Sequence, residues 1–188
     1  MKRVRYGNYP LVYPLPAVLV GAIVDNKPNF ETLGNCGIVS VNPAVIYISS
    51  DKSNYTNNGI KEHGVFSINI PSVDLIERVD YCGLVSGRNT DKSKVFECFY
   101  ESNEKVPMIT ECPVNMACKV IKTFEVHNKM DVFVGEVMET FVREDCTTNG
   151  YADTKKINPL TYCMDNKYWS IGDTLGKGFN IGKDYRNK

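Results

Sequence analysis

The stretch CKVIKTFEVHNKMDVFVGEVMETFV, residues 118–142, contains two long strand-like runs joined by a polar turn. The runs at 118–126 and 131–142 are rich in Val, Ile, Phe and Thr, which favour extended backbone. The residues between them, His127–Met130, predict a turn. The second run is long for a strand, and Gly135 in its middle predicts a kink of the kind found in bent barrel strands.

Shorter strands and two short helices are predicted before this pair. The apolar run at 17–24 predicts a buried strand, and residues 65–70 alternate as a strand does before Pro71. The other expected elements are strands at 38–41 and 44–49 broken at Asn42-Pro43, a helix at 55–62 with Thr56 as N-cap and Gly64 as stop, a helix from Ser72 or Asp74 to about Leu84, a turn at Asp25–Asn29 and an irregular tail from Tyr168. This order predicts a mainly β fold with antiparallel strands and a few short helices.

The patterns of two common nucleotide-binding folds are missing. The elements do not alternate as βαβ units, and Gly172, Gly176 and Gly178 do not form a GxGxxG after a strand. No GxxxxGK[ST] motif occurs either. A nucleotide site in this chain must therefore be of another kind.

Length and composition favour one globular domain over residues 1–188, with a core at about 10–180. Apolar residues make up 43%, and 22 basic residues balance 22 acidic ones, which argues against a general nucleic-acid binder. No stretch approaches the roughly 20 apolar residues of a membrane span. The basic N-terminus is followed by Pro10, Pro14 and Pro16, which break any signal-peptide core, so a cytoplasmic location is expected.

The cysteines and histidines do not predict a metal centre. Seven cysteines include no CxxC pair, and the histidines are only His63 and His127. Free thiols in a reducing compartment are therefore expected, without a zinc site or a disulfide framework.

The run YCGLVSGRNTDKSK, residues 81–94, concentrates small residues, hydroxyls and cations after a helix-like stretch. Gly83 and Gly87 allow close backbone approach, Ser86 supplies a hydroxyl and Lys92 a positive charge. This combination suits a polar, anionic ligand, and a solvated surface loop is the competing interpretation.

Four segments together resemble the flavin reductase-like family, and most closely its flavoredoxin branch. They are NFETLGNCG at 29–37, SSDKSNYTN at 49–57, FSINIP at 66–71 and the loop at 81–92. The resemblance covers roughly residues 10 to 180. It implies a split β-barrel that binds FMN and forms a homodimer, with the flavin near the subunit interface.

The resemblance also implies the site residues. Asn29 and Thr32 would hydrogen-bond the flavin ring, and Asn35 would lie against it. Ser50, Lys52 and Thr56 are the candidates for the phosphate and ribityl chain, because hydroxyls, a cation and a helix N-terminus favour phosphate. Ser86 and Lys92 come from the loop, with Lys92 stabilising the reduced flavin, and His127 would approach from the neighbouring subunit. Relatives often have an aromatic residue in place of Asn35, so ring stacking would be weaker or supplied by Tyr162 or Trp169.

The function that follows is an FMN-dependent oxidoreductase that passes electrons from NADH, NADPH or a protein donor through FMN to an acceptor. The protein would supply binding, orientation and electrostatics, and no catalytic residue is assigned. Two alternatives stay open at this point: a module that binds FMN or haem without turnover, and a structural dimeric barrel whose site has decayed.

Overall fold

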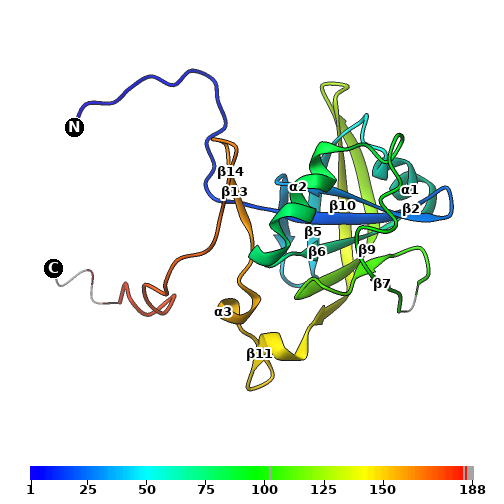
Figure 1. Cartoon of the computed structure of the whole chain (residues 1–188). Coiled ribbons are helices and arrows are strands. Elements are labelled where there is room, and N and C mark those ends of the chain that lie inside the picture. The colour runs from blue at the N-terminus through cyan, green and yellow to red at the C-terminus, as the bar shows by residue number, and fades with distance from the viewer. Residues whose placement is uncertain (102, 184, 186–188) are drawn as a thin grey trace.

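The computed structural model describes residues 1–101, 103–183 and 185, and its centre is a seven-stranded antiparallel sheet (Figure 1). Its strands, in sheet order, are β3 (Lys27–Leu33), β2 (Val18–Val24), β6 (Val65–Ile70), β9 (Val114–Val126), β10 (Met130–Val142), β5 (Val45–Asp51) and β4 (Cys36–Ser40). Every pair is antiparallel, which confirms the predicted mainly β fold.

The sheet curves into a barrel that does not close fully, because a split remains between β3 and β5. These strands lie close together, but β3 pairs only with β2, and β5 pairs with β10 and β4. Just before β4, the Ser49 N–H donates to the Asn35 carbonyl at 2.8 Å and extends the β4–β5 ladder toward the end of the split. Further along, side chains bridge it, with the Ser50 hydroxyl 3.1 Å from both carboxyl oxygens of Glu31. The result is a split barrel.

Strand β2 is buried on both faces, as its unbroken apolar run predicts. Val18, Val20 and Ala22 point into the barrel interior, where they meet Phe66 and Phe133. Leu19 points the other way, into a second core with Phe30, Val79 and Phe96. Because side chains alternate along a strand, this one segment holds both cores together.

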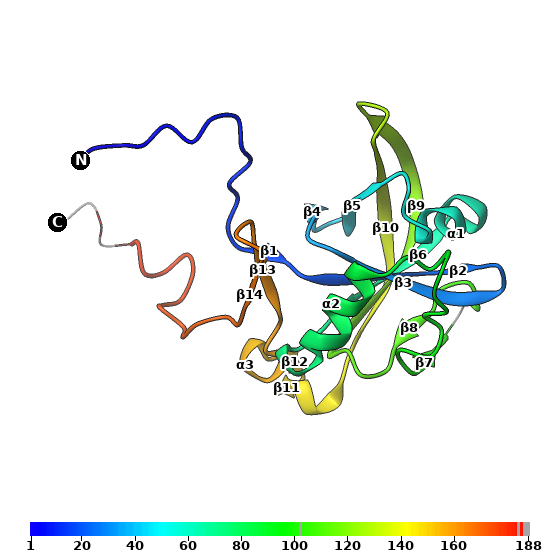
Figure 2. The ribbon, with the colours of Figure 1, turned by 45° about the horizontal axis from the view of Figure 1, so that its top comes forward.

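Two helices cover the sheet near the split. Helix α1 (Thr56–His63) packs on β2, and α2 (Ile76–Leu84), which follows a 3₁₀ turn at Val73–Leu75 (η1), packs beside β3 (Figure 2). Gly64 ends α1 with a φ of 66°, as predicted. The prediction of Thr56 as N-cap is wrong: Tyr55 holds that position, and the Thr56 hydroxyl accepts a hydrogen bond from Asn29.

The long hairpin of β9 and β10 matches its prediction. Its turn has His127 and Asn128 in the left-handed region, with φ of 50° and 53°. The register shifts between Val134 and Gly135, and a Cβ on Gly135 would lie 2.8 Å from the ring of Phe66. The kink predicted at Gly135 is thus a β-bulge, placed where the strand passes over a core aromatic residue.

Other predictions need correction. Only Asp25 and Asn26 form the turn after β2, and Asn29 lies inside β3. Pro28 does not end this strand, because β3 has a partner on one side only and proline is tolerated on such an edge strand. The tail does not become irregular at Tyr168, since β14 is a strand there. Strand β3 as a whole has no prediction. The other elements without one are β1 (Leu15–Pro16), β13 (Thr161–Cys163) and β14 (Lys167–Trp169), which form one sheet, the pairs β7 (Cys98–Phe99) with β8 (Met108–Ile109) and β11 (Thr147–Thr148) with β12 (Tyr151–Ala152), the 3₁₀ turn η2 (Glu144–Cys146) and α3 (Thr154–Ile157).

Within the described ranges, no helix combines the length and the apolar character needed to cross a membrane. The same part of the chain holds no group of three or more His, Cys, Asp or Glu side chains arranged to bind a metal ion.

The contact of α1 with β2 predicts the effect of one substitution. A Cβ on Gly59 would lie 2.1 Å from the Ile23 carbonyl oxygen, so the helix must move if Gly59 becomes Ala. We expect Gly59→Ala to lower the free energy of unfolding by about 1–3 kcal/mol, although alanine is the better helix former. Urea denaturation measures this. Asn58→Ala, at an exposed position of the same helix, is the control and should keep or slightly raise the stability; equal stability of the two variants would contradict the close packing.

Candidate functional site

A groove, here called the β3 groove, runs along β3 between α2 and the loop at 83–92. It consists of an apolar end, a middle and an outer end, with volumes of about 400, 170 and 330 Å³. The middle shares with the apolar end the residues Thr32, Gly83 and Leu84, and with the outer end Asn29, Tyr55, Gly87 and Lys92. Because neighbouring cavities share these residues, the three lie in a row beside the split of the barrel, and the name β3 groove covers all of them.

The apolar end is walled by the small sheet of β1, β13 and β14. Tyr162 and Tyr168 pack edge to face, with ring centroids 5.3 Å apart. The Tyr162 hydroxyl donates to Asn166 at 2.6 Å and the Tyr168 hydroxyl to Asp80 at 3.0 Å, so both rings are held in place. This end therefore offers a fixed aromatic and aliphatic wall.

The middle of the groove is polar and mostly buried. The Asn29 amide donates to the Thr56 hydroxyl at 2.8 Å, which joins β3 to the start of α1. The Thr32 hydroxyl donates to the Val79 carbonyl at 2.5 Å and fixes β3 against α2. Residues 54–56 and 82–87 complete the walls.

Lys92 anchors the loop to the barrel. Its ammonium group donates to the carbonyls of Phe30 at 2.9 Å and Cys82 at 2.8 Å, and the residue is 4% exposed. Burial lowers its pKa, and the nearby Cys82 and Glu31 raise it. A lysine ammonium has three N–H donors, so one remains for another acceptor in the groove.

The outer end carries mixed charges. The Arg88 guanidinium lies over the Tyr55 ring, 5.3 Å from its centroid, and Lys27 pairs with Asp91 at 3.0 Å. Hydrogen bonds from the Ser93 side chain and from Lys27 hold the pKa of Asp91 well below its usual range. Gly87 passes so close to β3 that a Cβ there would lie 2.1 Å from the Asn29 side-chain oxygen. This close approach is why the loop needs glycine at that position.

The structure brings five of the predicted site residues together as walls of the groove: Asn29, Thr32, Thr56, Ser86 and Lys92. Ser50 lies one layer behind, bonded to Glu31. Three others lie elsewhere on the same chain, with Asn35 exposed before β4, Lys52 paired to Glu125 at 2.7 Å and His127 exposed in the hairpin turn. Tyr162 lines the apolar end, whereas Trp169 is not among the residues that line the groove.

One residue of the groove, Glu31, has no role in the sequence-based prediction. It is 5% exposed and lines the middle of the groove. Burial raises its pKa to about 7, against the opposing effects of hydrogen bonds from Ser50 and Asn54 and of the Lys92 charge. The available signal is a carboxylate between Phe30 and Leu33, two large apolar residues that are close in sequence.

The chain belongs to the flavin reductase-like family, because the flavin reductase like domain matches residues 11–169. It is similar in structure to a flavoredoxin from Methanosarcina acetivorans, at 39% identity over 98% of this chain and 100% of that one, with a TM-score of 0.95. It is also similar to the flavoredoxin of Desulfovibrio vulgaris (Miyazaki F), at 32% identity over 97% and 100% of the two chains, with a TM-score of 0.89. An FMN-binding protein from Thermus thermophilus shares the fold at 20% identity, covering 94% of this chain and 100% of that one with a TM-score of 0.80. The resemblance to this family and to its flavoredoxins is confirmed.

The buried carboxyl of Glu31 predicts how stability depends on pH. Its pKa is about 7 in the folded protein and near 4.5 when unperturbed, so between these values the folded chain binds more protons than the unfolded chain. The contribution of Glu31 to the free energy of unfolding is therefore present below about pH 4.5 and is lost as the pH rises through 7. The loss is on the order of 3 kcal/mol.

Urea denaturation from pH 4.5 to 8 measures this loss for the wild type and for Glu31→Gln, which keeps the shape of the neutral acid. We expect Glu31→Gln to remove that part of the decline. Glu97→Gln, at an exposed position, is the control and should follow the wild type. A Glu31→Gln variant whose stability declines as steeply as the wild type would show that this carboxyl is not held neutral.

Proposed function

We propose that the protein binds FMN in the β3 groove and acts as a flavin-dependent oxidoreductase of the flavin reductase and flavoredoxin type. The observation that supports this most is the polarity of the groove, which changes along its length from a fixed aromatic wall at Tyr162 to a buried cation at Lys92. FMN has the same succession of a flat apolar ring, a polar ribityl chain and an anionic phosphate. The donor set of the groove therefore fits FMN.

In this proposal the ring occupies the apolar end, against Thr32, Gly83 and Leu84. The phosphate meets residues 54–56 at the start of α1, together with Ser86 and the free N–H of Lys92. Helix N-termini and hydroxyl groups favour phosphate, and a buried ammonium adds charge where water is scarce. Ser50 supports the site from behind.

Bound FMN would supply the hydride and electron chemistry, and the chain binds it, orients it and sets the local charge. Lys92 favours negative charge in the groove, including the charge that a flavin gains on reduction. In this proposal NADH, NADPH or a protein donates electrons to the bound FMN, and the reduced FMN passes them to a separate acceptor.

Asn35, Lys52 and His127 are proposed to contact a flavin held by a second copy of the chain. Lys52 lies at the base of the hairpin turn that carries His127, since the backbone N–H of Lys52 donates to the Lys129 carbonyl at 2.9 Å. A hairpin that crosses to a partner would bring this end of β9 and β10 to the partner's groove. The site would then be completed by both copies.

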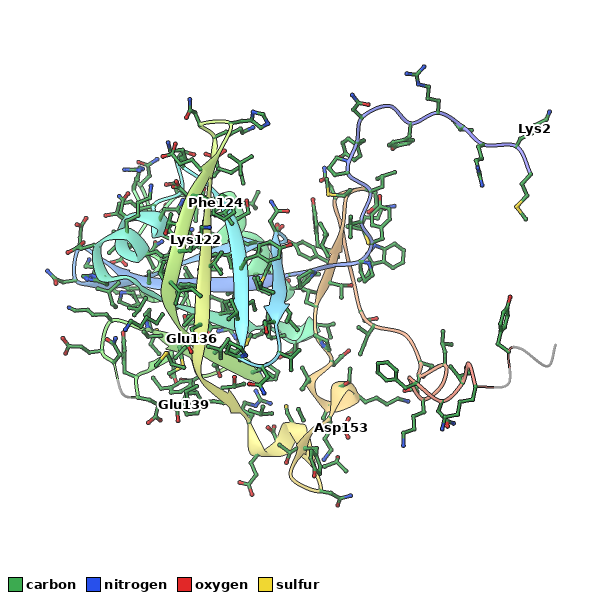
Figure 3. All side chains as sticks on the ribbon, turned by 180° about the vertical axis from the view of Figure 1, so that it is seen from behind. Lys2, Lys122, Phe124, Glu136, Glu139 and Asp153 are labelled. Carbon is green, nitrogen blue, oxygen red and sulfur yellow. The ribbon has the colours of Figure 1, made fainter. Side chains whose placement is uncertain are left out.

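Exposed apolar side chains support a homodimer. Along the hairpin they include Phe124 of β9, labelled in Figure 3, with Ile121, Val126 and Met138. The segments before β1 and after β14 extend away from the barrel (Figure 1), and they carry exposed Tyr, Leu, Val, Ile and Phe side chains. Extended apolar segments of this kind gain stability by covering a second subunit.

We expect the purified protein to bind FMN and become yellow, and the colour to bleach with NADH or NADPH under anaerobic conditions. Gly83→Leu should weaken FMN binding at least tenfold, because the leucine side chain narrows the groove beside Thr32. A Cβ on residue 83 would lie 3.5 Å from the Thr32 Cβ, which is an ordinary contact that the fold accommodates. Fluorescence titration gives the affinities.

Tyr81→Leu introduces the same residue on α2 outside the groove lining and is the matched control, expected to bind FMN as the wild type does. Equal FMN affinity of the two variants would contradict the placement of the site. Bound FMN that no donor bleaches would instead favour a binding module without turnover.

The dimer is tested separately by light scattering after size exclusion. We expect a mass twice the 21.2 kDa of one chain. Phe124→Asp should shift the protein toward the monomer because it places a charge in an apolar interface, whereas Thr140→Asp, an exposed change on β10, should not. A monomeric wild type that binds FMN fully would refute the shared site.

A further inference from the structure

A carboxyl group, that of Glu31, lies in the wall of the groove where the proposed function places an anion. The residue lines the same cavity as residues 54–56, Ser86 and Lys92. It comes from β3, and its hydrogen-bond partner Ser50 comes from β5, so the carboxyl sits in the split itself. FMN binding as proposed above makes no use of it.

Burial favours the neutral form of Glu31, and its hydrogen bonds can be made in either form of the carboxyl group. The Ser50 oxygen lies 3.1 Å from both carboxyl oxygens and accepts a hydrogen bond from the Asn54 amide at 3.0 Å. A serine hydroxyl carries one proton and has two lone pairs. If Glu31 is neutral, its O–H donates to the Ser50 oxygen and the Ser50 O–H donates to the other carboxyl oxygen. Each carboxyl oxygen then has its own hydrogen bond. An ionised Glu31 shares the single Ser50 proton between two oxygens.

The charges around Glu31 act in opposite directions. Lys92, from the loop, favours the ionised form, and Asp51, from β5, disfavours it. The Cys82 and Tyr55 side chains are the other titratable groups that line this cavity. Burial raises the pKa of Cys82, and the hydrogen bond to Asp25 raises the pKa of Tyr55. Since the pKa of Glu31 is about 7, both of its forms are populated near neutral pH.

We propose that Glu31 couples phosphate binding in the β3 groove to proton uptake, so that a phosphate held at residues 54–56 requires Glu31 in its neutral form. The proposal rests on FMN binding as proposed above. An ionised Glu31 places a second negative charge beside the phosphate and offsets the positive charge of Lys92. Binding therefore draws a proton onto Glu31 at pH values where the free groove has lost it.

FMN affinity measured by fluorescence between pH 6 and 9 tests this coupling. For the wild type we expect the dissociation constant to increase by up to about tenfold per pH unit above pH 7, as linkage requires for one coupled proton. In Glu31→Gln this increase should be absent, and only the titration of the FMN phosphate, with a pKa near 6, should remain. Asp51→Asn is the matched control and should keep the increase.

Calorimetry at pH 8 in buffers of different ionisation enthalpy measures the proton directly, and it needs only the wild type. Uptake of close to one proton with FMN, and of none with riboflavin, which lacks the phosphate, supports the proposal. FMN binding without proton uptake, or equal uptake with riboflavin, overturns it. If FMN does not bind at any pH, the proposed function fails as well, whereas bound FMN with the same pH dependence in Glu31→Gln overturns the coupling alone.

Discussion

The gap between β3 and β5 is the constraint on which the rest of the structure depends. Strands in a closed barrel normally satisfy their backbone groups with both neighbours, whereas β3 has a ladder partner on one side only. Side chains take over on this side of β3: Glu31 meets Ser50 of β5 across the gap, and Asn29 meets Thr56 at the start of α1. Helix α2 and the loop at 83–92 then cover this open edge, so the groove forms where the sheet does not close.

The same gap concentrates charge. Lys92 ties the loop to β3 and α2 through two carbonyl oxygens, and it is buried together with Glu31 in a part of the molecule that excludes water. Charges in such surroundings interact far more strongly than on the surface. One lysine therefore holds the loop in place and also puts a positive charge in the wall of the groove, while one glutamate adds a negative charge there when it ionises. In the proposed function, structural stability and ligand binding depend on the same two residues.

The sequence predicted the parts of the fold that depend on local chemistry. Strand β6, the stop at Gly64 and the hairpin with its bulge at Gly135 follow from side-chain alternation and from the freedom of glycine. Contacts between distant segments were harder to predict. Lys52 looked suited to a phosphate, but it pairs with Glu125, and nothing near it in the sequence announces that partner. Glu31 has no predicted role because only the fold brings Ser50 to it, and Pro28 predicts a turn at Asn29 where the chain continues as β3.

A crystal structure of the protein with FMN tests the central claim most directly, which is that the β3 groove, beside the split, is the ligand site. We predict the flavin ring against Thr32 and Gly83, with its phosphate at residues 54–56 and within hydrogen-bond distance of Lys92. A flavin bound on another face of the barrel, with the β3 groove still empty, would contradict this account.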